Sequence, residues 1–298
     1  MTVQILSNVG PDRIELAYER LGDPAAPPVL LIMGLGAQLI AWPDGLCDAL
    51  VAHGLQLIRF DNRDAGLSTH FSSAPAPTFA AALAGDPSSA AYTLSAMAAD
   101  TVGLLDGLGI ASAHLVGASM GGFIAQTIAI EHPARVRSLT SIMSSTGDRT
   151  VGQPRPEAMA LLASPPATNR DEAVQRTLNA VRVLGSPGFP ADLDAVADRA
   201  ARAYERSNDP PAILRQAVAV IASGDRTARL RSLAVPTLVL HGTDDPMIDV
   251  SGGRATAAAI PGATLAVFDG MGHDLPPALW PAFASRIAEL VRTSSSSR

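Results

Sequence analysis

The stretch Gly117-Ala118-Ser119-Met120-Gly121 places a serine two residues from a glycine on either side. An apolar segment with the character of a strand, Ala113 to Val116, precedes it, and Phe123 to Ile130 follows with helical character. In a strand-turn-helix setting such a serine takes up a strained backbone conformation, and the glycines let strand and helix come close enough to expose its hydroxyl. The stretch therefore predicts a nucleophilic serine, although five residues alone also fit an ordinary strand-to-helix turn.

The composition limits what can surround this serine. The chain has 298 residues, 47% of them hydrophobic, which favours one large α/β domain over two. Its net charge is -6 without a basic run, so neither nucleic acid nor anionic lipid is an expected partner. Cys47 is the single cysteine, which excludes an intramolecular disulfide. Met1 to Gly10 does not resemble a signal peptide and there is no 18-residue apolar stretch, so we expect a cytoplasmic protein without a membrane span.

Apolar segments alternate with helical patterns along the chain, which predicts a mostly parallel, eight-stranded sheet flanked by helices. The expected strands, the first two forming an antiparallel hairpin, are Val3 to Leu6, Ile14 to Glu19, Val29 to Met33, Leu55 to Phe60, Ala113 to Val116, Arg137 to Ile142, Thr237 to His241 and Thr264 to Phe268. The expected helices between and after them are Pro43 to Ala52, Leu94 to Leu108, Gly121 to Glu131 and Pro276 to Val291. A polar run, Ser294 to Ser297, is expected to fray. Ligand sites in such sheets lie at the carboxyl ends of the strands, so reacting residues are expected in the loops there.

The alternation stops between residues 146 and 225. Prolines there separate helical segments at Arg170 to Val183, Leu193 to Arg206 and Ala212 to Ser223, with no candidate strand. We interpret 146–225 as a helical cap inserted after the sixth strand, and 1–145 with 226–298 as the core domain. Such a cap would supply apolar walls for a substrate and exclude water, whereas the simpler alternative is a structural appendage.

A serine hydroxyl needs a base at neutral pH, and histidine is the natural candidate. His273 lies in Gly270-Met271-Gly272-His273-Asp274, a glycine-lined loop just after the last expected strand. The other five histidines have structural or solvated contexts. These are His114 and His241 in strands, His132 at a helix end, and His53 and His70 in polar surface segments.

A carboxylate is then needed to orient the imidazole and stabilise its protonated form. Gly242-Thr243-Asp244-Asp245-Pro246 follows an expected strand and offers two adjacent candidates, and the residues alone do not separate Asp244 from Asp245. Serine, aspartate and histidine nevertheless come in the chain order in which the α/β-hydrolase fold delivers nucleophile, acid and base.

The chain resembles the α/β-hydrolase fold family over nearly its whole length. Ile32-Met33-Gly34-Leu35-Gly36 is similar to the family's oxyanion loop, and Asp61-Asn62-Arg63-Asp64-Ala65-Gly66-Leu67-Ser68 to its D-x-R-G-x-G-x-S segment. Gly242 to Pro246 resembles the acid loop, with Asp245 in the acid's place. The resemblance implies a catalytic triad of Ser119, Asp245 and His273, and an oxyanion hole made by the backbone N–H groups of Leu35 and Met120.

Two residues depart from the wider family pattern. Met33 stands where most members have histidine, and Asp64 where most have glycine. Together with Ala41-Trp42-Pro43-Asp44 they resemble the branch that contains aclacinomycin methylesterase, a likeness covering mainly the first 70 residues and the serine turn. It implies a serine carboxylesterase that forms an acyl-enzyme, with a methylesterase among the candidates. A lactonase, a carbon-carbon bond hydrolase and a cofactor-free perhydrolase could use the same triad, and a ligand receptor on this fold is the non-enzymatic alternative.

No cofactor is expected. Gly34 and Gly36 form G-x-G without the third glycine of a dinucleotide site or the lysine of a phosphate loop. His, Cys, Asp and Glu show no metal-ligand spacing along the sequence, so no metal is expected either. The expected partner is a small-molecule ester, and the oligomeric state stays open, a homodimer included.

Overall fold

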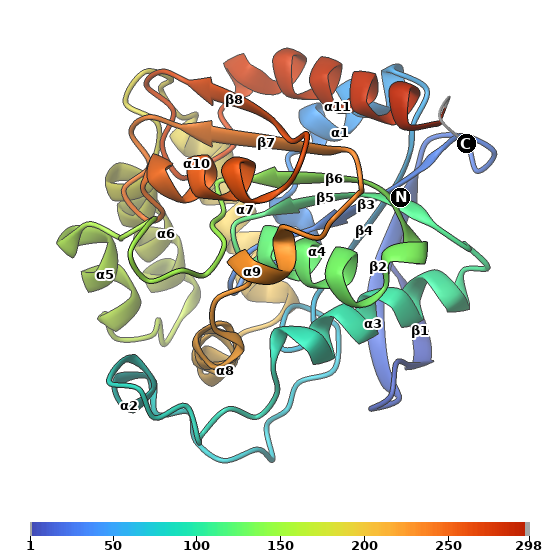
Figure 1. Ribbon diagram of the computed structural model, residues 1–298. Coiled ribbons are helices and arrows are strands. Elements are labelled where there is room, and N and C mark those ends of the chain that lie inside the picture. Colours follow the sequence, from blue (N-terminus) through green and yellow to red (C-terminus); the bar gives the residue numbers. More distant parts are fainter. Residues whose placement is uncertain (1, 296–298) are drawn as a thin grey trace.

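An eight-stranded sheet runs through the centre of the protein, whose computed structural model describes residues 2–295 (Figure 1). The strand order is β1-β2-β4-β3-β5-β6-β7-β8; β1 and β2 pair antiparallel, as do β2 and β4, and all other pairs are parallel. The strands are β1 (Gln4–Val9), β2 (Ile14–Leu21), β3 (Pro28–Ile32), β4 (Gln56–Phe60), β5 (Ala113–Ala118), β6 (Val136–Ile142), β7 (Thr237–Gly242) and β8 (Thr264–Phe268). The predicted mostly parallel, eight-stranded sheet is confirmed.

Both faces of the central part of the sheet are buried, because the side chains of β3, β4 and β5 alternate between two hydrophobic clusters. In β3, Leu30 and Ile32 belong to one cluster while Val29 and Leu31 belong to the other. The first cluster is covered by α3 (Leu94–Gly107), α4 (Met120–Glu131) and α10 (Val250–Ala259), and the second by α1 (Asp44–Ala52) and α11 (Trp280–Ser295). The layers therefore fix the central strands, whose carboxyl ends carry the loops of interest.

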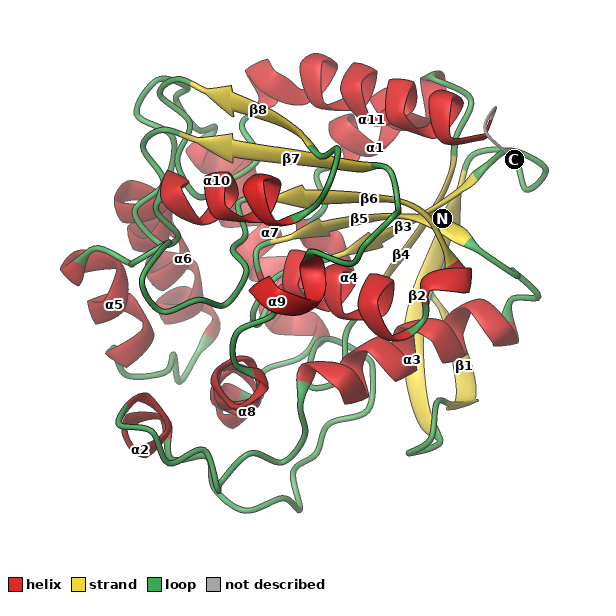
Figure 2. Cartoon of the chain, in the orientation of Figure 1, coloured by secondary structure: helices red, strands yellow, loops and turns green. Residues whose placement is uncertain are grey.

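Between β6 and β7 the chain forms helices and no strand, within residues that the structure describes throughout. The first four of these helices lie toward the side of the molecule to which the strand arrows of β6, β7 and β8 point, and the last lies beside α4 and α10 (Figure 2). In chain order, the helices are α5 (Pro156–Ala163), α6 (Arg170–Leu184), α7 (Leu193–Arg206), α8 (Pro210–Ser223) and α9 (Thr227–Leu230). Elsewhere the chain adds α2 (Phe79–Leu83) and the short 3-10 helices η1 (Leu39–Ala41), η2 (Pro133–Arg135) and η3 (Pro277–Leu279).

The last helix differs from the prediction at both ends. A 3-10 turn occupies residues 277–279, and α11 begins only at Trp280 and continues through Ser295. Ser294 therefore does not fray: its hydroxyl donates back to the carbonyl oxygen of Leu290, at 2.7 Å. The remainder of the predicted frayed run, 296–297, lies outside the described residues. Within residues 2–295, every helix is too short or too polar to cross a membrane.

Candidate active site

The turn at Ser119 has the strained geometry that its sequence predicts. Ser119 has a φ of 55° and ψ of -121°, outside the regions that non-glycine residues normally occupy. A Cβ atom at position 117 would lie 2.2 Å from the carbonyl oxygen of Gly121, and one at 121 would lie 1.9 Å from that of Ile32. Because no side chain fits at either position, the two glycines are what lets β5, the turn and α4 pack together.

Backbone hydrogen bonds hold Ser119 in this conformation. Its N–H donates to the carbonyl oxygen of Ile142 at the end of β6, at 2.9 Å. Its own carbonyl oxygen accepts from the hydroxyl of Ser144, at 2.6 Å. Ser144 is buried and was not predicted as a site residue. The strain at the turn is therefore balanced by contacts with the neighbouring strand end.

Ser119, His273 and Asp245 come together above the carboxyl ends of β5, β7 and β8. His273 Nε2 lies 3.0 Å from Ser119 Oγ, and His273 Nδ1 lies 2.7 Å from Asp245 Oδ2. The imidazole side chain is 11% exposed, so most of its surface is shielded from solvent. With Nδ1 donating to the carboxylate, the lone pair on Nε2 faces the serine hydroxyl, which is the arrangement that proton transfer from serine requires.

Asp245 is buried, and its own loop supplies its hydrogen bonds. Oδ1 accepts from the backbone N–H groups of Met247 and Ile248, at 2.9 and 2.8 Å. Burial by itself would raise the pKa of the Asp245 carboxyl, but the neighbouring His273 and His241 outweigh it and hold that pKa well below its usual range. The adjacent Asp244 instead accepts a hydrogen bond from the Thr243 hydroxyl, at 2.6 Å. The carboxylate beside His273 is therefore the second of the two candidates.

His241 is a second buried imidazole at this site that the sequence did not single out. It is fully buried at the end of β7, and its Nε2 lies 2.7 Å from the carbonyl oxygen of Ile248 and 3.5 Å from Asp245 Oδ2. His241 therefore stabilises the loop that carries Asp245. The sequence signal was its position immediately before Gly242 in the same strand.

The predicted oxyanion loop, 32–36, lies directly against Ser119. A Cβ atom at Gly34 would be 3.1 Å from the Cβ atom of Ser119. The Met33 side chain has no hydrogen-bonding group that could hold this loop; instead, Asn62 Nδ2 donates to the Met33 carbonyl oxygen, at 3.0 Å. A buried glutamine from α8, Gln216, accepts from the Gly36 N–H at 2.7 Å. The loop is thus anchored at both ends by amide side chains.

The histidine loop is anchored to the helical segment between β6 and β7. The His273 N–H donates to the carbonyl oxygen of Leu184, the last residue of α6, at 2.6 Å. Ser186 Oγ accepts from the Gly272 N–H at 2.9 Å and donates to the Asp274 carboxylate. Burial raises the pKa of Asp274, although the hydrogen bond from Ser186 opposes it. The loop that carries His273 therefore depends on residues almost ninety positions away in the chain.

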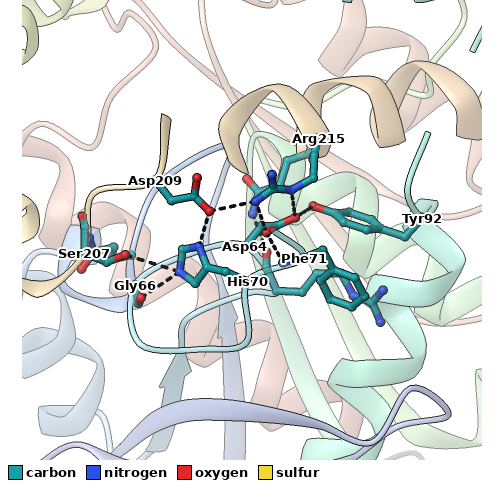
Figure 3. Close-up of polar contacts among 11 residues, drawn as sticks. Asp64, Gly66, His70, Phe71, Tyr92, Ser207, Asp209 and Arg215 are labelled. Atoms are coloured by element: carbon teal, nitrogen blue, oxygen red, sulfur yellow. Dashed lines mark hydrogen bonds and ion pairs between the residues drawn. The ribbon is translucent and has the colours of Figure 1, made fainter. Parts of the chain in front are cut away.

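A polar cluster joins α8 to the loop after β4 (Figure 3). Arg215 donates from Nε and one Nη to both carboxylate oxygens of Asp64, at 2.9 and 2.7 Å, and also to Asp209 at 2.8 Å. Tyr92 donates its hydroxyl to Asp64 at 2.6 Å, and burial together with the Asp64 charge raises the pKa of this phenol. Asp64 has a φ of 62° and is almost completely buried. The ion pair with Arg215 therefore explains why an aspartate stands at position 64, where most members of the family have glycine.

His70 belongs to the same cluster, which corrects the expected surface context. Its Nδ1 lies 2.8 Å from Asp209 and its Nε2 3.1 Å from the Gly66 carbonyl oxygen, and the side chain is 21% exposed. Ligand atoms of Asp64, His70 and Asp209 lie within 4.8 Å of one another, although these residues have no metal-ligand spacing in the sequence. Both carboxylates already bind the Arg215 guanidinium, so the positive charge at this place is supplied by the protein itself.

Comparison with known proteins identifies the family. Residues 27–276 match the model of the alpha/beta hydrolase fold, and the chain belongs to that family. It is similar to rhodomycin D methylesterase DnrP of Streptomyces peucetius, with 29% identity over 316 residues that cover 99% of this chain and 100% of that protein. It is also similar to 2-hydroxymuconate semialdehyde hydrolase of Pseudomonas sp. (strain CF600), with 34% identity over 218 residues, 69% of either chain.

A solved structure shares the fold. The thermophilic esterase from Thermogutta terrifontis superimposes with a TM-score of 0.72 at 24% identity, covering 99% of both chains. The predicted resemblance to a hydrolase of the methylesterase branch is confirmed by the family and by DnrP. Together they support an enzyme that hydrolyses carboxylic esters.

Proposed function

We propose that this hydrolase is a serine esterase whose catalytic triad is Ser119, His273 and Asp245. We further propose that its substrate is a bulky carboxylic ester with a small alcohol group, and that methanol is the preferred leaving alcohol. The observation that carries the proposal is the continuous hydrogen-bonded line from Ser119 Oγ through the imidazole to the buried carboxylate. The methyl ester is favoured because the relative matched over its whole length is a methylesterase.

The proposed reaction has two acyl-transfer steps. His273 Nε2 takes the proton of Ser119 as Oγ bonds to the ester carbonyl carbon, and the resulting oxyanion is stabilised by the backbone N–H groups of Leu35 and Met120. His273 then gives its proton to the departing alcohol, leaving the acyl group on Ser119. A water molecule enters, and its oxygen bonds to the acyl carbon as His273 takes one of its protons. The bond between the acyl carbon and Ser119 Oγ then breaks as His273 returns the proton to Oγ, and the carboxylic acid leaves.

The low pKa of Asp245 suits this cycle. A carboxyl that stays ionised keeps Nδ1 of His273 protonated and favours the imidazolium that forms when Ser119 is deprotonated. The helical segment 146–225 would act as the cap of this site. Its contacts with the histidine loop and with the oxyanion loop support that role, and its apolar residues would exclude water from the acyl-enzyme.

A labelling and turnover experiment tests the proposal. A fluorophosphonate should form an adduct on Ser119, detected by mass spectrometry, and the wild type should release one equivalent of methanol for each acid formed from a polycyclic methyl ester. The variant Ser119→Ala should lose at least about 10⁴-fold in kcat while staying folded. Absence of an adduct together with inactivity on a panel of methyl esters, longer esters and lactones would reject the esterase. Preferential turnover of a vinylogous ketone, the reaction class of the alternative carbon-carbon hydrolase, would reject the ester assignment alone.

A further inference from the structure

Gln216 lies in the middle of α8 and makes a hydrogen bond with the oxyanion loop. Its side chain is fully buried and uses both ends. Oε1 accepts from the Gly36 N–H and Nε2 donates to the Arg63 carbonyl oxygen, each at 2.7 Å. Because one partner is a donor and the other an acceptor, the orientation of the amide is fixed. One side chain thus ties the oxyanion loop to the loop that follows β4.

The surroundings of Gln216 hold it in this position. The preceding residue, Arg215, makes the two-pronged ion pair with Asp64, which sets the position of α8 on the core. Three residues before Gln216, the side chain of Ile213 covers Gly36 so closely that a Cβ atom on that glycine would lie 2.7 Å from Ile213 Cγ1. The helix therefore rests on the oxyanion loop itself.

The loop and the residue after it supply one backbone hydrogen bond, from the Ala37 N–H to the Gly34 carbonyl oxygen at 3.2 Å, and no side-chain support. Met33 offers no polar side-chain atom, and Gly34 and Gly36 have no side chain. The Leu35 N–H, which has to point at the developing oxyanion, is one residue away from the Gly36 N–H that Gln216 binds. Glycines on both sides leave the backbone around Leu35 permissive, so the orientation of the Leu35 N–H depends on this turn bond and on what holds Gly36.

We propose that Gln216 is a positioning residue of the oxyanion hole, and that through it the helical segment between β6 and β7 takes part in transition-state stabilisation. This inference rests on the proposed esterase function. Gln216 does not touch the substrate; it holds the peptide between Leu35 and Gly36 so that the donor is in place before the ester is attacked. Its loss should therefore slow acylation and leave substrate binding nearly unchanged.

Three variants test the role. Gln216→Met keeps the size of the side chain and removes both hydrogen bonds. Gln216→Glu keeps the acceptor for Gly36 and, when ionised, loses the donor to Arg63. Val220→Ala, one turn further along α8, is the matched control, because Val220 packs half-buried against the hydrophobic core and its apolar side chain can make neither hydrogen bond. Thermal unfolding, kcat and KM on one chromogenic ester, and the rate of fluorophosphonate labelling are measured for all three and for the wild type.

The expected pattern separates positioning from packing. Deleting an oxyanion donor typically costs about 10²- to 10³-fold in kcat, and misplacing one should cost less, about 10- to 100-fold, in Gln216→Met. The labelling rate should fall by the same factor, because the phosphonyl oxygen occupies the same hole, while KM changes by less than about threefold. Gln216→Glu should recover part of the loss, and Val220→Ala should lower the melting temperature with kcat near that of the wild type.

The outcomes of this experiment separate the two proposals. A wild type that is neither labelled at Ser119 nor active on esters rejects the esterase and this inference with it. A wild type that is labelled, with Gln216→Met labelled equally fast, rejects the positioning role and leaves the esterase intact. An equal loss of kcat in Val220→Ala and Gln216→Met, or a loss confined to KM, likewise rejects it, because general loosening of the helix would then explain the effect.

Discussion

Two pairs of loops build the candidate site, and they are held in different ways. The serine turn and the acid loop are held by the core alone: Gly121 packs on Ile32 of β3, and Asp245 accepts from N–H groups two and three residues ahead. The oxyanion loop and the histidine loop also depend on the segment between β6 and β7, through Gln216 and Ser186. The comparison indicates that half of the proposed catalytic geometry is set by the core and half by the helices between β6 and β7.

The largest effect is expected from the locally held acid. Asp245→Asn should lower kcat by about 10⁴-fold, because the amide no longer stabilises the imidazolium or selects the tautomer with Nδ1 protonated. Steady-state kinetics measure the loss, and Asp244→Asn is the control that should stay close to wild type, because its carboxylate contacts Thr243 instead. Similar losses in the two variants would contradict the assignment of the acid.

Asp245→Asn should also change how the free energy of unfolding depends on pH. The folded-state pKa of Asp245 is lowered, so its contribution to stability is present above the pKa of an unfolded aspartate, about 3.9, and is lost as the pH falls through the lower folded value. The free energy of unfolding of the wild type should therefore exceed that of Asp245→Asn at neutral pH, and the difference should shrink below about pH 4. Urea unfolding at a series of pH values measures it; a difference that grows toward acid would contradict the sign.

The second prediction concerns protein stability rather than catalysis, and it tests how tightly the turn at Ser119 is packed. Gly121→Ala places a Cβ atom 1.9 Å from a strand carbonyl oxygen and should destabilise the protein by at least about 3 kcal/mol. Gly109→Ala is the matched control: position 109 has a φ of 68° with open space around it, so the change should cost only about 1 kcal/mol. Urea unfolding of both variants, read by circular dichroism, decides whether the turn is as tightly packed as described.

The smallest effect concerns the remote support of the histidine loop. Ser186→Ala removes the acceptor for the Gly272 N–H and the donor to Asp274, so His273 should lose precision and kcat should fall about tenfold with KM nearly unchanged. Ser164→Ala is the control, since Ser164 donates only to the nearby Leu161 carbonyl oxygen within the same helical segment. If the two variants behave alike in steady-state kinetics, the histidine loop does not depend on this contact.

The sequence predicted the sheet and the locally held residues, because their signals are local. Glycines two residues from Ser119 indicate a tight turn. Apolar runs that end in Gly or Asp indicate strands whose following loops lie at one edge of the sheet. The departure at Asp64 was also visible in the sequence. Its partner was not, because Arg215 lies 151 residues further along the chain.

The remote supports could not be predicted for the same reason. Gln216 and Gly36 are 180 residues apart, and only the packing of α8 brings them together. A weak signal did exist: Arg215 and Gln216 are adjacent polar residues inside an otherwise apolar helical run, Ala212 to Ser223, where burial would require partners for both. Ser144 and Ser186 carried no comparable signal, since serine is common in loops of every kind.

The contact between α8 and Gly36 limits how substrate preference can be altered by exchanging parts between relatives. A transplanted helical segment would bring new walls for the acyl group, yet it would also remove the amide that orients the donor peptide unless it carried one at the matching turn. Grafts that preserve Arg215 and Gln216 while changing the solvent-facing and pocket-facing side chains are therefore the ones expected to keep turnover. Substrate specificity and the rate of the reaction would then both depend on side chains of α8.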